Sequence, residues 1–338
     1  MKRNKKIDLI TIGRSSIDLY SQNIGSKFEN IKGFDAFVGG SPLNIAVGCS
    51  RLGLDTEILT AVGNDKVGDF VLNFLEKENI NINNIPKING SRTSAVLLGI
   101  EPPNNFPLVF YRENAADSMI NINHVNSFQI ERCKILGVSG TALNKEPSRS
   151  AVIHAIKIAS KNNIPIIHDL DFRLDQWKNI SSFGKLTKSI LPLVNVIIGT
   201  EEEILATNIK SKNEVEINNQ QISSPKIKGN LLKEIKNILS FGIDTLIVKR
   251  GEKGVKIYNS NGRSYEIDGF PIKVLNVLGA GDAFASGFIY GYLKGWDLKK
   301  SCKMGNACGA LVVLQPGCAN FMPTLNETLE FINNHGGF

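Results

Sequence analysis

The feature that most constrains the fold is a repeated alternation between short apolar runs and segments with helical periodicity. The apolar runs lie at 7–12, 135–138, 164–167 and 194–198, and helical patterns such as 148–162 separate them. Strands joined by crossover helices pair in parallel, and short runs that are apolar on both faces are typical of buried strands. The sequence therefore predicts an α/β fold in which helices flank a mostly parallel central sheet.

A different pattern interrupts this alternation. Two β-rich runs at 93–100 and 108–112 are joined by a turn rich in proline and asparagine, which predicts a hairpin. Consecutive antiparallel strands do not belong in a wound parallel sheet. Together with one more strand-like segment, they predict a small β lid from about 31–38 and 91–113, on a single domain that spans 1–338.

Composition limits the classes of protein to which the chain can belong. Its 338 residues are 42% hydrophobic and 21% charged, which allows a large buried core. No apolar run approaches the roughly 20 residues of a bilayer span, and the basic start at 1–6 precedes a run too short for a signal peptide. The net charge of +7 is spread among acids. We therefore expect a cytoplasmic protein that binds neither nucleic acid nor membrane.

Two further features of the composition concern single segments and residue types. The five cysteines are scattered and form no CxxC pair, so we expect buried free thiols. The segment 207–230 is rich in Asn, Lys and Ser and shows little periodicity. That composition predicts a mobile surface insertion.

The segment 276–284, Asn-Val-Leu-Gly-Ala-Gly-Asp-Ala-Phe, carries the strongest chemical signal. A strand-like segment at 265–274 runs into these small residues, and a helix is predicted from about Gly281. Free N–H groups at a helix start attract an anion, and small residues let a phosphate approach the backbone. Asp282 could then act on the group that attacks the phosphate. The alternative is an ordinary turn with an aspartate that the helix dipole favours.

Polar and glycine residues near the N-terminus are candidates for binding a polyol. Asp18 follows the first predicted strand, in a loop at the edge where open α/β sheets place ligands. Gly39 and Gly40 precede a predicted helix that carries Asn44, whose amide can both donate and accept hydrogen bonds. Turn or capping roles explain the aspartate and the glycine pair equally simply.

Three arginines are candidates for binding an acidic substrate. Arg112 ends the second predicted lid strand, and Arg14 and Arg173 follow other predicted strands. A guanidinium group pairs with a carboxylate through two parallel hydrogen bonds. A surface ion pair remains the alternative for each of them.

Segments near both ends of the chain resemble the signatures of the ribokinase-like (PfkB) carbohydrate kinases. The segment 276–282 resembles the C-terminal signature, and 38–46 resembles the N-terminal one. The similarity covers nearly the whole chain. The chain most resembles the branch of the family that acts on a sugar acid of inositol catabolism. The segments that carry this closer resemblance are 13–20, 106–117, 169–173, 199–203 and 276–279.

This resemblance implies a ribokinase-like fold and ATP-dependent phosphorylation of a sugar acid beneath the lid. It implies that Asp282 deprotonates the sugar hydroxyl. The N–H groups of Gly279, Ala280 and Gly281 would form an anion hole for the transferred phosphoryl group. The residues that would position the sugar acid are Asp18, Gly39, Gly40, Asn44, Arg112, Arg14 and Arg173.

The resemblance also implies a place for the nucleotide. The backbone around Lys249, Gly251 and Gly254 would border ATP. Asn306 and Gly309 lie on a predicted helix of small residues, which could leave a flat slot for adenine. Helix–helix packing explains the same small residues.

Two positions bear on metal ions. Within the family an Asn-x-x-Glu motif helps to organise Mg²⁺, which implies an indirect role for Glu202, although Gly199 replaces the Asn. Many members also use a monovalent cation such as K⁺. Asn276 replaces the Asp that usually supports it, so potassium activation is doubtful. The family's Asp-x-Asn-x-Arg motif appears here with Asp171 in the place of its Asn.

Several alternatives remain open at this point. The same frame could serve a kinase for ribose, fructose or 2-keto-3-deoxygluconate, or a non-catalytic sugar-binding sensor. The chain contains neither a Walker phosphate-binding motif nor a complete dinucleotide fingerprint. Exposed lid edges could pair between subunits, so a homodimer through the lid is a further hypothesis.

Overall fold

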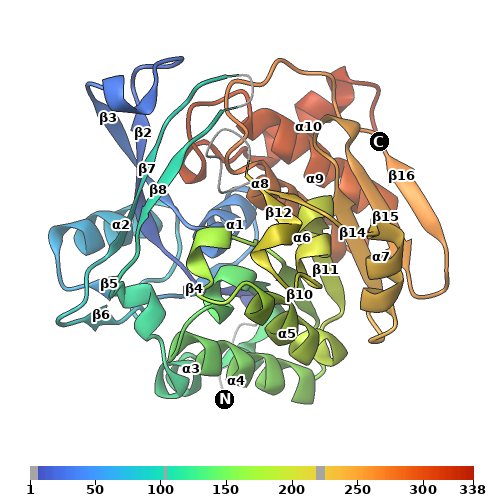
Figure 1. Ribbon diagram of the computed structural model, residues 1–338, viewed down its shortest axis with the longest axis horizontal. Helices are drawn as coiled ribbons and strands as arrows, with labels where there is room; N and C mark the ends of the chain where they lie inside the picture. The colour runs from blue at the N-terminus through green and yellow to red at the C-terminus, as the bar shows by residue number, and fades with distance from the viewer. Residues whose placement is uncertain (1–6, 103–104, 218–224) are drawn as a thin grey trace.

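A twisted central sheet runs through the molecule in the computed structural model, which describes residues 7–102, 105–217 and 225–338 (Figure 1). Within these residues the sheet has eight strands, from one edge to the other β16 (Ser264–Ile267), β15 (Val255–Asn259), β14 (Thr245–Lys249), β11 (Val196–Thr200), β10 (Ile166–Asp169), β9 (Cys133–Ser139), β1 (Ile7–Ile12) and β4 (Thr56–Leu59). Neighbours from β14 to β4 pair in parallel, and β15 and β16 pair antiparallel at one edge. The predicted α/β sheet is confirmed.

Helices cover both faces of this sheet, and each face has its own hydrophobic core. One core contains residues of α3 (Ile122–Phe128), α4 (Ser148–Lys161), α5 (Ser181–Ile190), α6 (Glu201–Ala206) and α7 (Leu231–Leu239). The other contains residues of α1 (Ser41–Arg51), α2 (Lys66–Lys77), α8 (Ala280–Leu293), α9 (Leu298–Val312) and α10 (Leu325–Asn334). Alternate residues of a strand serve opposite faces, so Ile10 lies in the first core and Leu9 in the second.

A second sheet stands beside the central one, at the upper left of Figure 1. Its order is β3 (Phe34–Gly39), β2 (Ser16–Ser21), β7 (Ser94–Leu98) and β8 (Leu108–Tyr111). Two of the expected lid strands, β7 and β8, pair antiparallel as the predicted hairpin. The third, β3, is separated from β7 by β2. The prediction that Asp18 lies in a loop is wrong, because it lies on β2. Ser16 and Asp18 point inward on this strand, so its hydrophobic alternation is inverted and hard to detect in the sequence.

Two segments differ from their predicted structure. β16 ends at Ile267, so the strand predicted to reach residue 274 is much shorter; Pro271 could not donate to a strand ladder. The segment 207–230 contains a short antiparallel pair, β12 (Val215–Glu216) and β13 (Lys226–Ile227), and Ile227 is buried against α6 and its neighbours. The remaining part of that prediction, 218–224, lies outside the described residues.

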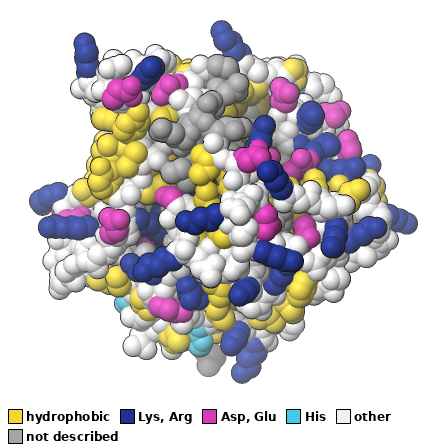
Figure 2. All heavy atoms as spheres, viewed as in Figure 1, with side chains coloured by type: hydrophobic (Ala, Val, Ile, Leu, Met, Phe, Trp, Pro, Cys, Tyr) yellow, Lys and Arg dark blue, Asp and Glu magenta, His cyan; other side chains and the backbone are white. Residues whose placement is uncertain are grey.

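Another two-stranded sheet lies next to α2. β5 (Val62–Gly63) pairs with β6 (Lys87–Ile88) near α2. On the face shown in Figure 2, lysines and arginines lie at separate positions with acidic side chains between them. All five cysteines are buried thiols, as predicted. Among the described residues, no helix has both the length and the apolar character needed to cross a bilayer.

Candidate active site

A cavity of about 1780 Å³ lies at the carboxyl ends of β10, β11 and β14. Phe106, in the loop between β7 and β8, contributes to its wall, so the second sheet reaches over it. No sequence pattern singles out Phe106. The predicted site residues on the wall are Arg173, Glu202, Lys249, Gly251, Gly254, Gly279, Ala280, Gly281, Asp282, Asn306 and Gly309.

The turn before α8 presents backbone donors to this cavity. Gly279 caps the helix with φ +83°, and a Cβ there would lie 2.2 Å from the sulfur of Cys318, so only glycine fits. Within the described residues, the N–H groups of Gly279, Gly281 and Asp282 donate no hydrogen bond. Ala280 N–H donates to Val277 O over 3.4 Å, so this group is less available for the anion hole than predicted. The other three amides are placed for an anion.

Asp282 lies in the first turn of α8, directly beside these amides. Asn44 Nδ2, from α1, donates to Asp282 Oδ2 over 2.7 Å. Burial and the charge of Asp171 raise the pKa of Asp282, although Asn44 and Lys249 oppose the shift. A carboxylate with a raised pKa is a stronger proton acceptor, as a general base requires.

The Asp18 carboxylate on β2 lies beside Gly39 of β3, whose direct partner on β2 is Ser16. Asp18 is 5% exposed and accepts a hydrogen bond from Ser16 Oγ over 2.7 Å. Burial raises the pKa of Asp18, and the Arg14 charge opposes that rise. A Cβ on Gly39 would lie 1.9 Å from Asp18 Oδ2, so a side chain there would displace the carboxylate. Asp18 therefore keeps its position only because residue 39 is a glycine.

The remaining sugar-side candidates do not line the large cavity, and Arg14 and Arg112 are among them. Asp18, Gly39, Gly40 and Asn44 are not among the residues that line it. Burial is the main cause that raises the pKa of the Cys318 thiol, and the charges of Asp282 and Asp18 raise it further. The structure therefore brings the two carboxylates into one neighbourhood, with Asn44 in contact with Asp282.

Arg112 is committed to partners inside the protein. Its Nε donates to Asp117 Oδ2 over 3.0 Å, and Nη2 pairs with the same oxygen. Nη1 donates to Gln176 Oε1 over 2.6 Å and to Thr141 O over 3.2 Å. Because Asp117 is 1% exposed, this ion pair is buried. These contacts argue against the predicted role of Arg112 in binding a substrate carboxylate.

Arg173 pairs with the aspartate that replaces the family's Asn. Its Nη2 lies 2.9 Å from Asp171 Oδ1, and Asp171 Oδ2 accepts from Ser139 and Thr141 hydroxyls over 2.8 and 3.0 Å. Burial alone would raise the pKa of Asp171, but Arg173 and the hydroxyls outweigh it and lower that pKa. Asp171 has φ +36°, a conformation that is uncommon outside glycine and often found at functional sites.

Arg14 is the least engaged of the three arginines. Its one hydrogen bond within the described residues runs from Nη1 to Ser16 Oγ, over 2.9 Å. Its guanidinium group lies 5.4 Å from the centre of the Phe110 ring. Arg112 and Arg173, by contrast, each form an ion pair with a buried aspartate.

Lys249 reaches the anion-binding turn with its side chain. Nζ lies 3.2 Å from Asp169 Oδ1 and 3.9 Å from Glu203 Oε2. A Cβ on Gly281 would lie 2.9 Å from the same Nζ. The sequence implies only a backbone role here, because nothing in it shows that Asp169 and Glu203 meet this lysine.

The predicted metal positions differ in how well they fit an ion. Glu202 lies in the first turn of α6 on the cavity wall. Among the described residues, no group of three His, Cys, Asp or Glu side chains forms a metal cage. Asn276 is fully buried: Nδ2 donates to Pro316 O over 3.0 Å, and Oδ1 accepts from Leu278 N–H over 3.1 Å. A neutral amide already paired in this way does not fit a cation ligand.

The expected adenine wall has a structural role. Asn306 Nδ2 donates to Ile267 O and Asp268 O over 3.3 and 2.9 Å. A Cβ on Gly309 would lie 3.2 Å from Ala280 O, so helix packing against α8 explains this glycine. Asn306 remains on the cavity wall.

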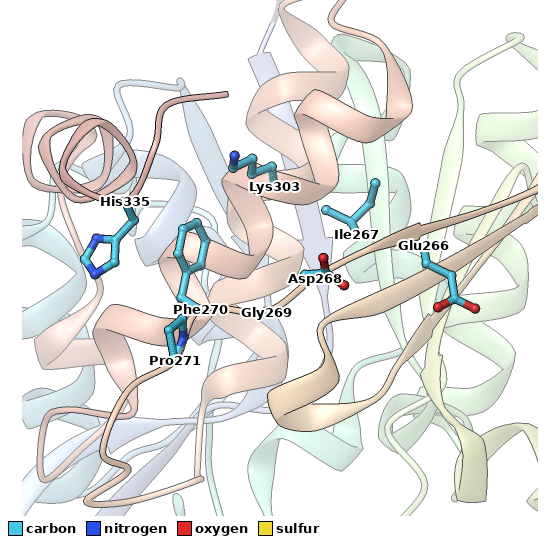
Figure 3. Close-up of a pocket in the computed structure, with 8 residues that line it drawn as sticks. All are labelled: Glu266, Ile267, Asp268, Gly269, Phe270, Pro271, Lys303 and His335. Atoms are coloured by element: carbon cyan, nitrogen blue, oxygen red, sulfur yellow. The ribbon is translucent and has the colours of Figure 1, made fainter.

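A smaller cavity of about 470 Å³ lies next to the segment that Asn306 holds (Figure 3). Phe270 and His335 stand side by side at its edge, with ring centres 5.7 Å apart. The segment from Gly269 to Pro271 lines both cavities. Asn306 therefore holds the backbone that directly precedes this shared segment.

Comparison with known proteins places this geometry in a family. Residues 6–325 match the pfkB family carbohydrate kinases. A 5-dehydro-2-deoxygluconokinase of Clostridium perfringens is 33% identical over 329 residues, which cover 97% of this chain and 93% of that protein.

Solved structures share the fold. An E. coli protein named ribokinase II, in complex with ATP and Mg²⁺, has a TM-score of 0.83 at 24% identity and covers 97% of this chain and 100% of its own. A Vibrio cholerae fructokinase with bound fructose, ADP and potassium has a TM-score of 0.80 at 24% identity, covering 97% and 99%. The chain therefore belongs to the pfkB family of carbohydrate kinases and is an enzyme that transfers a phosphoryl group to an alcohol.

Proposed function

We propose that this kinase uses ATP to phosphorylate the 6-hydroxyl of 5-dehydro-2-deoxy-D-gluconate, a step of myo-inositol catabolism. The name of the Clostridium perfringens relative supports this substrate. Arg14 supports an acidic sugar, because it has a single hydrogen bond among the described residues and arginine is well suited to bind a carboxylate.

The observation that carries the chemistry is the set of uncommitted amides at Gly279, Gly281 and Asp282, beside a carboxylate with a raised pKa. Asp282 takes the proton of the sugar hydroxyl while the oxygen of that hydroxyl bonds to the γ-phosphorus of ATP. The bond from that phosphorus to the bridging oxygen breaks, and ADP leaves. The amides stabilise charge on the phosphoryl oxygens, and positioning supplies most of the remaining acceleration.

Mg²⁺ neutralises phosphate charge when it is bound, as the ATP complex of the E. coli protein suggests by analogy. We propose that Glu202 supports it indirectly. We further propose that the enzyme works without K⁺, because Asn276 is neutral and already paired.

On the sugar side, we propose that Arg14 binds the substrate carboxylate. It has a single hydrogen bond within the described residues, whereas Arg112 is held by a buried acid. Asp18, Gly39 and Gly40 would contact the sugar hydroxyls. Asn44 would add a contact through Oδ1, which has no hydrogen-bond partner among the described residues.

The test is a comparison of sugar-stimulated ADP release across acids and neutral sugars. The proposed substrate should give the highest kcat/KM, followed by 2-keto-3-deoxygluconate, which also carries a carboxylate. Fructose and ribose should be poor acceptors, because they leave Arg14 without an anionic partner. Faster turnover of a neutral sugar than of either acid would reject the acidic-substrate proposal.

Two further proposals concern the cellular context. We place the enzyme in the cytoplasm, where its substrate ATP is available.

A homodimer through the second sheet is supported by edge strand β8, on which Val109 and Tyr111 are 39% and 58% exposed. Sedimentation of the wild type and of Tyr111→Lys tests this: a monomeric wild type would contradict it.

A further inference from the structure

We propose that the Lys249 ammonium group is a catalytic residue that contacts the transferred phosphoryl group, with Asp169 and Glu203 as its positioning residues. The proposal rests on the phosphoryl-transfer site described above. It assigns to the side chain a role that differs from the backbone contact implied by the family resemblance.

The position of Nζ is the first observation. Lys249 ends β14, and its side chain lies on the wall of the large cavity. Nζ is close enough to Gly281 that a Cβ there would lie 2.9 Å from it. Because Gly281 N–H is one of the uncommitted donors, the ammonium group and the amides face the same space. A phosphate held by those amides would therefore meet Nζ.

The second observation is the way in which the lysine is held. Asp169 and Glu203 contact it from β10 and from α6. Glu203 is fixed in turn, since Oε1 accepts from Phe172 N–H over 3.2 Å and Oε2 from Thr200 N–H over 2.8 Å. Such a shell orients the ammonium group before the substrate binds, which is what electrostatic stabilisation of a transition state requires.

The charge of Lys249 is also secured. Burial would lower the pKa of Lys249, but Asp169, Glu203 and Asp282 outweigh burial and raise it. The side chain therefore carries a positive charge while the γ-phosphoryl group moves. A lysine of this kind acts as a point charge on phosphate oxygens.

The experiment uses Lys249→Met and measures both turnover and nucleotide binding. We expect kcat to fall about 10²- to 10³-fold, as when one transition-state donor is removed. Affinity for ATP, and for ADP with aluminium fluoride as a phosphoryl mimic, should fall about tenfold or more, while affinity for ADP changes within about threefold. This binding test is independent of which sugar is phosphorylated, so a wrong substrate would not affect it.

Two further variants separate catalysis from structure. Lys134→Met removes another Lys–Asp pair, with Asp8 at 2.6 Å, far from the cavity, and should leave kcat within about threefold of the wild type. Lys249→Met leaves Asp169 unpaired, and adding Asp169→Asn removes that buried charge. The double variant should recover the stability that Lys249→Met loses, but not its kcat. Recovery of kcat in this double variant, or an unchanged preference for ATP over ADP in Lys249→Met, would overturn the proposal.

Discussion

The phosphoryl end and the sugar end of the site are built in different ways. At the phosphoryl end, three backbone N–H groups of one turn have no hydrogen-bond acceptor among the described residues. At the sugar end, charged side chains from several segments meet, and Arg112 and Arg173 already pair with Asp117 and Asp171. The first arrangement depends on local backbone geometry, while the second depends on which side chains remain available in the folded protein.

This difference teaches that the two ends should respond differently to mutation. The phosphoryl end binds a group that all substrates of the enzyme share, so damage there should reduce kcat for every sugar. The sugar end recognises the acceptor, so damage there should change one substrate more than another. The predictions below test this contrast, beginning with the largest expected effect.

Asp282→Asn should reduce kcat about 10²- to 10⁴-fold, because it removes the general base. ATP affinity and the melting temperature should stay close to those of the wild type, since the amide is nearly isosteric. Steady-state kinetics with every active sugar measures the effect. A variant with near-normal turnover would eliminate Asp282 as the base.

Gly279→Ala should reduce kcat about 10²-fold, because the new Cβ would lie 2.2 Å from Cys318 Sγ and shift the anion-binding turn. Gly262→Ala is the matched control: it has φ +79° but nothing within 4 Å of the added Cβ. Both should lose about 1 kcal/mol or more of stability from backbone strain. Equal activities in the two variants would show that turn position does not matter.

Arg14→Met should raise KM for the acid sugar about 10- to 100-fold, as expected for loss of a charged hydrogen bond. A neutral sugar, if it reacts, serves as the internal control and should change little. Equal losses on both kinds of sugar would reject Arg14 as the carboxylate ligand.

Arg112→Met should act mainly on stability, by about 3–5 kcal/mol, because it leaves the buried Asp117 unpaired. Denaturant unfolding measures this loss. Adding Asp117→Asn should restore much of it. A stable Arg112→Met variant with a selective defect on acid sugars would instead support the role that the sequence predicts for Arg112.

The acid limb of the kcat/KM profile should lie above the ordinary aspartate pKa of about 3.9, because the pKa of Asp282 is raised by burial and by Asp171. The base works only when it is deprotonated, so activity should be lost as the pH falls through that raised pKa. Initial rates from acid to neutral pH measure the limb. An unshifted limb would mean that the carboxylate is better solvated than the structure shows.

Replacing K⁺ with Na⁺ or a large organic cation should change kcat by less than about threefold, the smallest effect predicted here. The paired amide of Asn276 is the reason. Asn276→Asp is the informative variant, and it should become more sensitive to K⁺. Strong potassium activation of the wild type would contradict the proposed ion independence.

Much of the fold was predictable because its signals are local. Apolar runs with helical segments between them predict parallel strands, and β1, β9, β10 and β11 lie where those runs are. β2 is the main exception. Its inward-facing residues include Ser16 and Asp18, so the packing of the second sheet, rather than hydrophobic alternation, determines this strand.

The site divides in the same way. The sequence by itself determined the turn from Gly279 to Asp282, because glycine's conformational freedom and a helix start are properties of a few consecutive residues. Only the tertiary structure decided which charges meet: Asn44 reaches Asp282 across 238 positions, and Lys249 reaches Asp169 across 80. Charge and hydrogen-bond energies depend on distances of a few ångströms, and those distances exist only once the distant segments have packed together.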